Sequence, residues 1–342
     1  MTDQSWPAIL ARLFAGDSIS SGEASWAMQR IMEGEATPAQ FGAFVAALRA
    51  KGETVDEIVG LVETMRSMSL KVEAGLGLVD TCGTGGDRAG TINVSTIAAL
   101  VVAGAGGRVA KHGNRSASSI CGSADVLEEL GVKIELGPAG VKACIEEAGI
   151  GFCFAPVFHP AMRHAGQPRR EIGVPTIFNF LGPLTNPAEA KHQAIGVSDP
   201  AMALKMAEVL RRLGSTRVLV FHGSDGLDEI STTGPSTIWD LKEGSVTEAQ
   251  IDPTDFGIPA AEAEDLKGGS SPENAKIVLQ VLDRAAGPAR DVVVINAAAA
   301  IIAAGLAEEF PAAIEMAAES IDSGKARRAL DDLIEVSNRP LD

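Results

Sequence analysis

Apolar residues recur at helical spacing through the first 70 residues of the chain. Four stretches, among them SSGEASWAMQRIMEG and TPAQFGAFVAALRAKG, each begin near a residue of the type that caps helices. They predict helices over 6–16, 20–34, 37–52 and 54–68, separated by Gly16, Gly34 and Gly52. We therefore expect a small all-helical domain at the N-terminus.

From Val79 the pattern changes to short apolar runs that alternate with helical stretches. Such alternation predicts an α/β fold, with a mainly parallel central sheet and helices on its faces. The expected strands are 77–83, 108–113, 132–136, 150–156, 193–197, 217–223 and 291–296. The expected helices are 95–106, 123–131, 137–149, 200–214 and 297–308.

Two segments interrupt the alternation. Residues 158–187 are rich in proline and glycine, with helix-like pieces around Arg170 and Phe178, and predict a crossing back to the helical domain that acts as a hinge. Residues 244–272 predict a β-rich or irregular surface excursion. The expected domains are a small helical one of 1–72 with 165–190, and a large α/β one of 73–164 and 191–342.

The composition narrows the classes of function. The chain has 342 residues and a formal net charge of -16, so its surface repels nucleic acid and we expect no nucleic-acid partner. The opening MTDQSWPAILARLF carries an acid and a proline where a secretory signal would be apolar, and the four cysteines form no C-x-x-C pair. We expect a cytoplasmic protein with reduced cysteines and no membrane span.

The stretch DTCGTGGDRAG holds four glycines among its eleven residues and lies between a predicted strand and a predicted helix. A glycine-rich loop followed by a helix N-terminus is a ready site for an anion such as phosphate. The spacing fits neither a Walker A loop nor a dinucleotide fingerprint. Beside a phosphate, the carboxylate of Asp87 would be repelled unless a cation or a hydrogen-bond donor lay between them. Asn93, Ser95 and Thr96 supply further side-chain oxygens at the start of the helix. The alternative is an ordinary turn in which Ser95 or Thr96 caps the helix.

A second polar stretch, KHGNRSASS, follows the predicted strand 108–113. Lys111 supplies a point charge and Arg115 a two-pronged donor, which together with several hydroxyls suit an anion. The alternative is a polar surface loop. Ser123, shortly after it, either caps a helix or donates to a phosphate.

Adjacent acids mark a third motif, DGLDEIS, after the strand 217–223. Asp228 and Glu229 predict a site for Mg²⁺, a hard cation that prefers carboxylates, water and substrate phosphate. In so acidic a chain the alternative is a solvated acid pair. The five histidines show no metal-ligand spacing, and Cys82 lacks a partner for nucleophilic catalysis.

Arg169 and Arg170 form a basic pair in the crossing segment. The functional interpretation is that one guanidinium binds the carboxylate of a second substrate. The alternative is a solvated surface pair.

The ordered set DTCGTGGD, TINVST, KHGNRSASS, CGSADVLEELG, REIGVPTIFNFLGPLTNP and DGLDEIS resembles the anthranilate phosphoribosyltransferases over nearly the whole chain. The resemblance implies Mg²⁺-dependent transfer of a phosphoribosyl group from 5-phosphoribosyl 1-pyrophosphate (PRPP) to anthranilate in tryptophan biosynthesis. It also implies a homodimer, formed through the helical domain, with the active site at the hinge between two domains.

The resemblance implies residue roles as well. Anthranilate contacts fall on Gly83, Asn114 and Arg169, and metal ligands on Ser95, Asp228 and Glu229. The PRPP site falls on Gly83, Gly86, Asp87, Thr91, Asn93, Val94, Ser95, Thr96, Lys111, His112, Gly113, Asn114, Arg115, Ser116, Ala117, Ser118, Ser119 and Ser123. The chain departs from the family pattern at Ile120–Cys121, where many relatives carry a lysine. No residue is assigned as nucleophile or general base.

Two other functions are compatible with this architecture. A pyrimidine nucleoside phosphorylase would use inorganic phosphate and a nucleoside, but the glycine-rich loop and the acid pair favour the pyrophosphate donor. A non-enzymatic nucleic-acid-binding relative would need a basic stripe, against which the net charge speaks.

Overall fold

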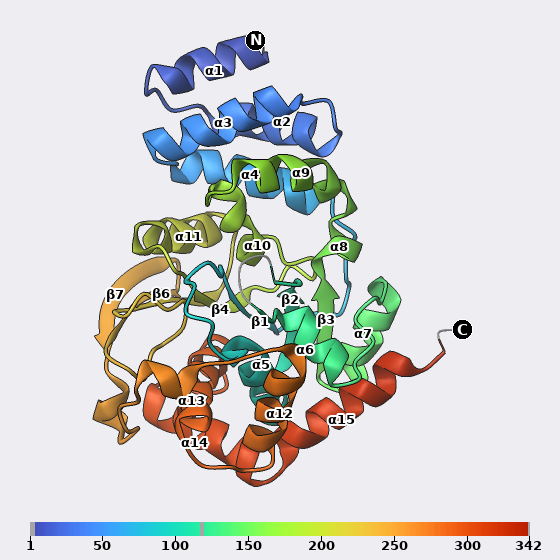
Figure 1. The fold of residues 1–342 in the computed structure, drawn as a ribbon, viewed down its shortest axis with the longest axis vertical. Coiled ribbons are helices and arrows are strands. Elements are labelled where there is room, and N and C mark those ends of the chain that lie inside the picture. The colour runs from blue at the N-terminus through green and yellow to red at the C-terminus, as the bar shows by residue number, and fades with distance from the viewer. Residues whose placement is uncertain (1–3, 117–119, 341–342) are drawn as a thin grey trace.

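The computed structural model describes residues 4–116 and 120–340. It begins with a bundle of four helices, which lies at one end of the molecule (Figure 1). They are α1 (Trp6–Phe14), α2 (Ser21–Met32), α3 (Pro38–Lys51) and α4 (Val55–Ser67). Ser20, Thr37 and Thr54 accept N–H groups in capping boxes at the starts of α2, α3 and α4. The four helices predicted from the spacing are confirmed.

The rest of the chain is built on one seven-stranded sheet of order β3-β2-β1-β4-β5-β6-β7. The strands are β1 (Leu78–Gly83), β2 (Arg108–Gly113), β3 (Ile150–Phe154), β4 (His192–Gly196), β5 (Arg217–Gly223), β6 (Ser236–Lys242) and β7 (Ser245–Ile251). Neighbours from β3 to β5 are parallel, whereas β6 and β7 add an antiparallel edge. The predicted fold class, a helical domain plus a mainly parallel α/β domain, is confirmed.

Helices cover both faces of the sheet. The helices of the large domain outside the crossing segment are α5 (Val94–Gly104), α6 (Ser123–Glu129), α7 (Pro138–Glu147), α11 (Pro200–Arg212), α12 (Ser271–Leu282), α13 (Pro288–Ala303), α14 (Phe310–Asp322) and α15 (Lys325–Asn338). On one face α5 and α13 pack in a core with α14 and α15 behind them. On the other face α11 joins the strands to α4 and the helical bundle in a second core.

The crossing segment runs from the end of β3 to the start of β4 and contacts the helical bundle. It contains α8 (Ala155–Phe158), α9 (Arg163–Ile172), α10 (Leu181–Leu184) and short 3₁₀ turns at Pro160–Met162 and Ile177–Asn179. Helix α9 packs against α2 and α3, and the ring of Phe178 lies 5.2 Å from that of Phe41. In the described part of the chain, no helix has the length and apolar character needed to span a membrane.

Two strand predictions are wrong. Residues 132–136 do bury alternate side chains, but they pair with no strand; instead the N–H of Lys133 donates to the hydroxyl of Ser337 on α15. Residues 291–296 lie within α13, whose β-branched run is tolerated because the helix is buried on all sides between the sheet, α5 and α14. The excursion 244–272 is confirmed as β7 followed by 3₁₀ turns at Pro253–Phe256 and Ala263–Leu266.

Candidate active site

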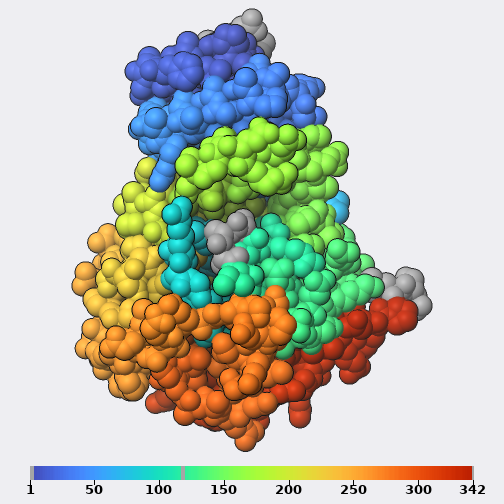
Figure 2. Space-filling view, viewed as in Figure 1, coloured from blue at the N-terminus to red at the C-terminus, as the bar shows by residue number. Residues whose placement is uncertain are grey.

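A cavity of about 340 Å³ lies at the carboxyl ends of β1 and β2, beneath α9 and α10. Figure 2 shows the hollow between the glycine-rich loop and the crossing segment. It is lined by fifteen of the residues proposed from the sequence: Gly83, Gly86, Asn93, Ser95, Thr96, Lys111, His112, Gly113, Asn114, Arg115, Ser116, Ser123, Arg169, Asp228 and Glu229. Asp87, Thr91 and Val94 do not line it, and Ala117, Ser118 and Ser119 lie outside the described residues.

The glycine-rich loop turns at the carboxyl end of β1 through left-handed backbone. Gly85 and Gly86 have φ angles of +65° and +87°, a region that favours glycine. The N–H of Gly85 donates to Oδ2 of Asp228 at 2.7 Å, and the hydroxyl of Ser198 donates to the Gly85 carbonyl at 2.8 Å. The loop is thus fixed between the acid pair and the end of β4.

The N-terminus of α5 opens on this cavity. The helix begins at Val94, so Ser95 and Thr96 lie inside it, and the alternative in which one of them is the N-cap does not hold. Asn93 occupies the cap position without a capping hydrogen bond, because its amide donates to the Cys121 carbonyl and accepts from Asn274. The N–H groups of Val94 and Thr96 donate to the carbonyls of Ile92 and Asn93, and the N–H of Ser95 donates to the Glu229 carboxyl. The helix start therefore offers an anion the positive end of its dipole rather than unpaired N–H groups.

Lys111 reaches the cavity from below. Its side chain is almost fully buried, and Nζ donates to the Thr81 carbonyl and, at 3.3 Å, to the hydroxyl of Ser95. Burial lowers the pKa of Lys111, and the nearby charge of Asp80 opposes that shift. Asp80 is fully buried and accepts from the His112 N–H at 3.0 Å and from the Asn186 amide at 2.7 Å. Neither Asp80 nor Asn186 was expected at the site from the sequence.

The acid pair lies at the end of β5, where the loop to β6 crosses the ends of β1 and β4. Burial, followed by the charge of Asp87, raises the pKa of Asp228 to about 7. The pKa of Glu229 is raised well above its usual range by burial and by Asp228. Ionisation of Asp228 and Glu229 is therefore unfavourable unless a cation enters this region.

These residues suit a divalent cation bound together with a substrate. Mg²⁺ is usually held by one or two carboxylates plus phosphate and water, so two acids and a hydroxyl suffice. The described residues contain no group of three or more His, Cys, Asp or Glu side chains arranged around one point. Ser95, Asp228 and Glu229 share the cavity wall and fit a cation that brings phosphate ligands with it.

Arg169 and Arg170 face different surroundings. Arg169 lines the cavity with its guanidinium 5.7 Å from the centre of the Phe178 ring, and burial lowers its pKa. Arg170 is exposed and does not line the cavity. Among the described residues no carboxylate forms a salt bridge with Arg169. The cavity therefore holds a partly desolvated cation without a counter-ion.

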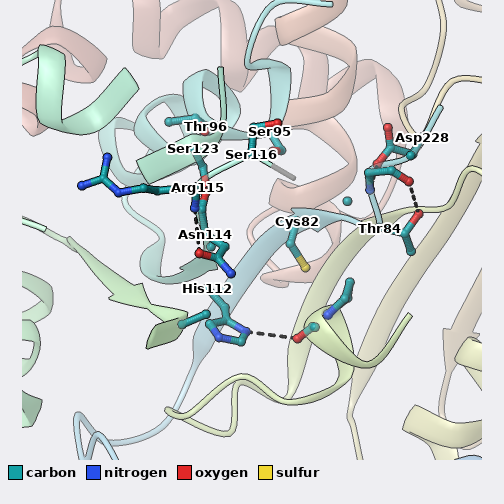
Figure 3. A pocket seen from close by; sticks show the side chains of 18 of the residues that line it. Cys82, Thr84, Ser95, Thr96, His112, Asn114, Arg115, Ser116, Ser123 and Asp228 are labelled. Carbon is teal, nitrogen blue, oxygen red and sulfur yellow. Dashed lines mark hydrogen bonds between the residues drawn. The ribbon is translucent and has the colours of Figure 1, made fainter. Parts of the chain in front are cut away.

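Arg115 points away from the cavity centre toward α6 (Figure 3). Its guanidinium forms salt bridges with Asp125 at 2.9 Å and Glu128 at 2.8 Å, and it lies 5.7 Å from the centre of the Phe154 ring. Ser123, the first residue of α6, donates its hydroxyl to the Asn114 carbonyl at 3.2 Å and is not the N-cap.

His112 lines the opposite side and is neutral. Its Nδ1 lies 3.0 Å from the Gly182 carbonyl, the contact drawn in Figure 3, and Nε2 has no hydrogen-bond partner among the described residues. Burial lowers the pKa of His112 to about 3, and the His159 ring, centred 5.2 Å away, adds to the shift. Since Nδ1 is the nitrogen beside a carbonyl, it carries the proton and Nε2 is an acceptor.

Several residues that line the cavity were not expected from the sequence. They come chiefly from the glycine-rich loop and the crossing segment. They are Cys82, Thr84, Gly85, Cys121, Gly122, Ala155, Phe178, Asn179, Gly182 and Pro183. Most are apolar or glycine, and only the path of the chain brings them to the cavity. Ile120, the departure from the family pattern, is 75% exposed and does not line it.

Comparison with known proteins places this geometry in a family. The model of the glycosyl transferase family helical bundle domain matches residues 7–69, and that of the family's a/b domain matches residues 76–327. The anthranilate phosphoribosyltransferase of Arthrobacter sp. (strain FB24) is 52% identical over 95% of this chain and 94% of its own length. The chain belongs to the anthranilate phosphoribosyltransferases. Its reaction is anthranilate phosphoribosyl transfer in tryptophan biosynthesis.

Solved structures of this transferase family superpose closely on the chain. The Thermus thermophilus enzyme is 40% identical, with a TM-score of 0.92, over 97% of this chain and 99% of that one. The Saccharomyces cerevisiae enzyme in complex with PRPP and Mg is 28% identical, with a TM-score of 0.88, over 97% of both chains. The alternative functions, a nucleoside phosphorylase and a nucleic-acid-binding protein, are therefore not those of this transferase.

Proposed function

We propose that the cavity holds both substrates of the transfer and Mg²⁺. PRPP lies along the glycine-rich loop, the start of α5 and the 111–119 stretch with Ser123, and anthranilate lies against Gly83, Asn114 and Arg169. Ser95, Asp228 and Glu229 hold the metal. The remaining PRPP contacts are those named from the family resemblance, including Asp87, Thr91 and Val94.

One observation supports this assignment above the others: the charge inside the cavity is unbalanced in two separate places. Asp228 and Glu229 are buried near each other and near Asp87, so a cation would stabilise their ionised forms. A metal ion bound together with pyrophosphate would supply that cation. Arg169, on α9, has no carboxylate partner among the described residues and fits a substrate carboxylate. Anthranilate and the metal complex of PRPP supply these two charges.

The residues of the chain position the substrates rather than react with them. The positive end of the α5 dipole and Lys111 stabilise phosphate oxygens, and Arg169 orients the anthranilate carboxylate so that its ortho amine faces the ribose. Bound Mg²⁺ would neutralise the pyrophosphate leaving group. The weakly basic aryl amine attacks as the neutral base, so the described side chains need only align it with C1 and exclude water.

Asp228→Asn combined with Glu229→Gln tests the metal assignment. We expect loss of Mg²⁺-dependent turnover, followed by anthranilate fluorescence, with circular dichroism unchanged. The matched control is Glu308→Gln with Glu309→Gln, an adjacent and exposed acid pair away from the cavity. Near-normal turnover of the double site variant at ordinary Mg²⁺ would remove the acid pair from the mechanism.

The same proposal extends to the assembly. The small domain comprises 1–72 with 165–190, in keeping with the packing of α9 on α2 and α3, and the large domain comprises 73–164 and 191–342. The family resemblance favours a homodimer formed through the helical domain, acting in the cytoplasm.

A further inference from the structure

Helix α13 carries one polar side chain in the middle of an apolar surface. All residues from Val292 to Ala303 are buried, and Asn296 is the only one among them that is not hydrophobic. A buried amide is costly unless each of its hydrogen-bonding groups finds a partner. Its position therefore needs a reason beyond packing.

Asn296 binds the backbone of a single residue from both sides. Its Oδ1 accepts from the N–H of Ile230 at 2.9 Å, and its Nδ2 donates to the carbonyl of Ile230 at 2.9 Å. Nδ2 also donates to the Val292 carbonyl at 2.8 Å, one turn earlier in α13. The side chain thus pairs with both backbone groups of Ile230, as a neighbouring strand would, although Ile230 lies outside the sheet.

Ile230 immediately follows Glu229, so this clamp acts on the acid pair. The loop that carries Asp228 and Glu229 connects β5 to β6 and has no regular structure of its own. Within the loop, Asp225 accepts from the hydroxyl of Ser231 at 2.6 Å and from the Leu227 N–H at 3.1 Å. These contacts brace the loop internally. Leu227 and Ile230 also bury their side chains in the core that contains α13, and Asn296 adds the side-chain hydrogen bonds that join the loop to that helix.

The acids need such an anchor. The ionised forms of Asp228 and Glu229, which are the forms that bind a metal, repel each other, and both side chains are buried away from water. A loose loop would relieve that repulsion by moving the acids apart, and the metal would then have to reassemble its own site at a cost in affinity.

We propose that Asn296 is a positioning residue for metal binding: by holding Ile230 at both its N–H and its carbonyl, it keeps Glu229 and Asp228 in the place where Mg²⁺ and pyrophosphate bind. The inference rests on the proposed role of the acid pair. It assigns no contact between Asn296 and substrate.

The test is Asn296→Leu, which keeps the approximate size of the side chain and removes all three hydrogen bonds. Ser320→Ala is the matched control, because Ser320 on α14 is equally buried and donates to the Val101 carbonyl of α5 at 2.7 Å without touching the loop. Two readouts do not depend on turnover. One is the Mg²⁺ concentration that gives half of the rise in Tm in the presence of pyrophosphate, and the other is amide hydrogen exchange in 227–231.

For Asn296→Leu we expect at least a tenfold higher Mg²⁺ midpoint and at least tenfold faster exchange in 227–231. For Ser320→Ala we expect a lower Tm but a Mg²⁺ midpoint within twofold of that of the unchanged protein. A lower Tm of Asn296→Leu with an unchanged midpoint would show a purely structural residue and overturn the proposal. If Asn296→Leu does not fold, Asn296→Ser is judged by the same criteria.

A third variant separates this inference from the function on which it rests. Asp228→Asn with Glu229→Gln should abolish the Mg²⁺-dependent rise in Tm. If that variant keeps the rise, the acid pair does not hold the metal and the proposed function fails at that point. If it loses the rise and Asn296→Leu does not shift the midpoint, only the role of Asn296 is wrong.

Discussion

At the scale of single residues, the site works through charges that the free protein leaves unbalanced. Asp228 is the clearest case, since burial and the charge of Asp87 raise its pKa to about 7. Arg169 is the complementary one, since burial lowers its pKa and no described carboxylate forms a salt bridge with it. A buried charge without a partner is unfavourable, and a ligand of opposite charge removes that cost. The site therefore favours ligands that carry the matching charge.

The raised pKa of Asp228 predicts how stability changes with pH. Because the folded state binds this proton more tightly than the unfolded chain, the contribution to stability is present at acid pH and is lost as the pH rises from about 4 through about 7. Without Mg²⁺, the free energy of unfolding of Asp228→Asn should therefore rise relative to that of the unchanged protein as the pH is raised from 5 to 8.

Urea unfolding at both pH values with a chelator measures this difference, and added Mg²⁺ should reduce it at pH 8. Glu309→Gln, a change at an exposed acid, is the control and should show no such trend. A difference that stays constant from pH 5 to pH 8 would contradict the raised pKa.

Arg169→Ala should raise the KM for anthranilate strongly. Loss of a charged hydrogen bond costs roughly 1.5–3 kcal/mol, which corresponds to about 10- to 150-fold. Arg169→Lys should recover part of the loss, because charge returns but the two-pronged geometry does not. Steady-state kinetics with Arg170→Ala as the control decides the matter, since Arg170 is exposed and outside the cavity. The reverse pattern would mean that Arg170 holds the carboxylate.

At the scale of elements, the site depends on how strands end. Four neighbouring parallel strands of the sheet end in glycine: Gly83, Gly113, Gly196 and Gly223. A Cβ atom at Gly196 would lie 1.6 Å from the Asp228 carbonyl oxygen, and one at Gly83 would lie 2.2 Å from Oδ2 of Asp228. The acid-pair loop therefore crosses the strand ends at a distance that only glycine allows.

Gly196→Ala should displace the acid-pair loop and reduce turnover by at least tenfold, because the clash is with backbone. Gly83→Ala should do less to the loop, because the clashing carboxylate of Asp228 can rotate away. Mg²⁺ dependence and Tm of the two variants measure the effect. Normal Mg²⁺ dependence of Gly196→Ala would show that the loop is free to shift without loss.

At the scale of the whole molecule, the cavity lies where the helical bundle meets the α/β domain. Arg49 on α3 pairs with Asp199 at the start of α11 at 2.6 Å, and Arg212 on α11 pairs with Asp56 on α4. These exposed ion pairs contribute little stability each, typically below about 1 kcal/mol. The shared core of α4 and α11 makes the main connection between the two parts.

The proposed homodimer places the helical bundle at an interface. Phe14 at the end of α1 is 68% exposed, which is unusual for so large an apolar side chain. Phe14→Glu should shift the protein from dimer toward monomer in sedimentation at micromolar concentration. Leu76→Glu, at a position that is 91% exposed in the α/β domain, is the control and should leave the dimer intact. Equal behaviour of the two variants would place the interface elsewhere.

The sequence by itself determined the local elements and the chemistry near them. Capping residues such as Ser20 and Thr37 mark helix starts whatever lies around them, because the hydrogen bonds that they make are local. The glycine-rich loop, Lys111 and the acid pair could likewise be read from short motifs, because each follows a strand whose apolar run is distinct.

Only the tertiary structure decided which of these motifs meet and what holds them. Asp80, Asn186 and Asn296 are ordinary polar residues in the sequence, and their roles come from contacts with residues between 32 and 106 positions away. The stretch 291–296 has the residues of a strand, yet it is a helix because burial on all sides overrides local preference. Long-range packing, which a local pattern does not encode, brings the acid pair to the glycine-rich loop and Asn296 beneath it.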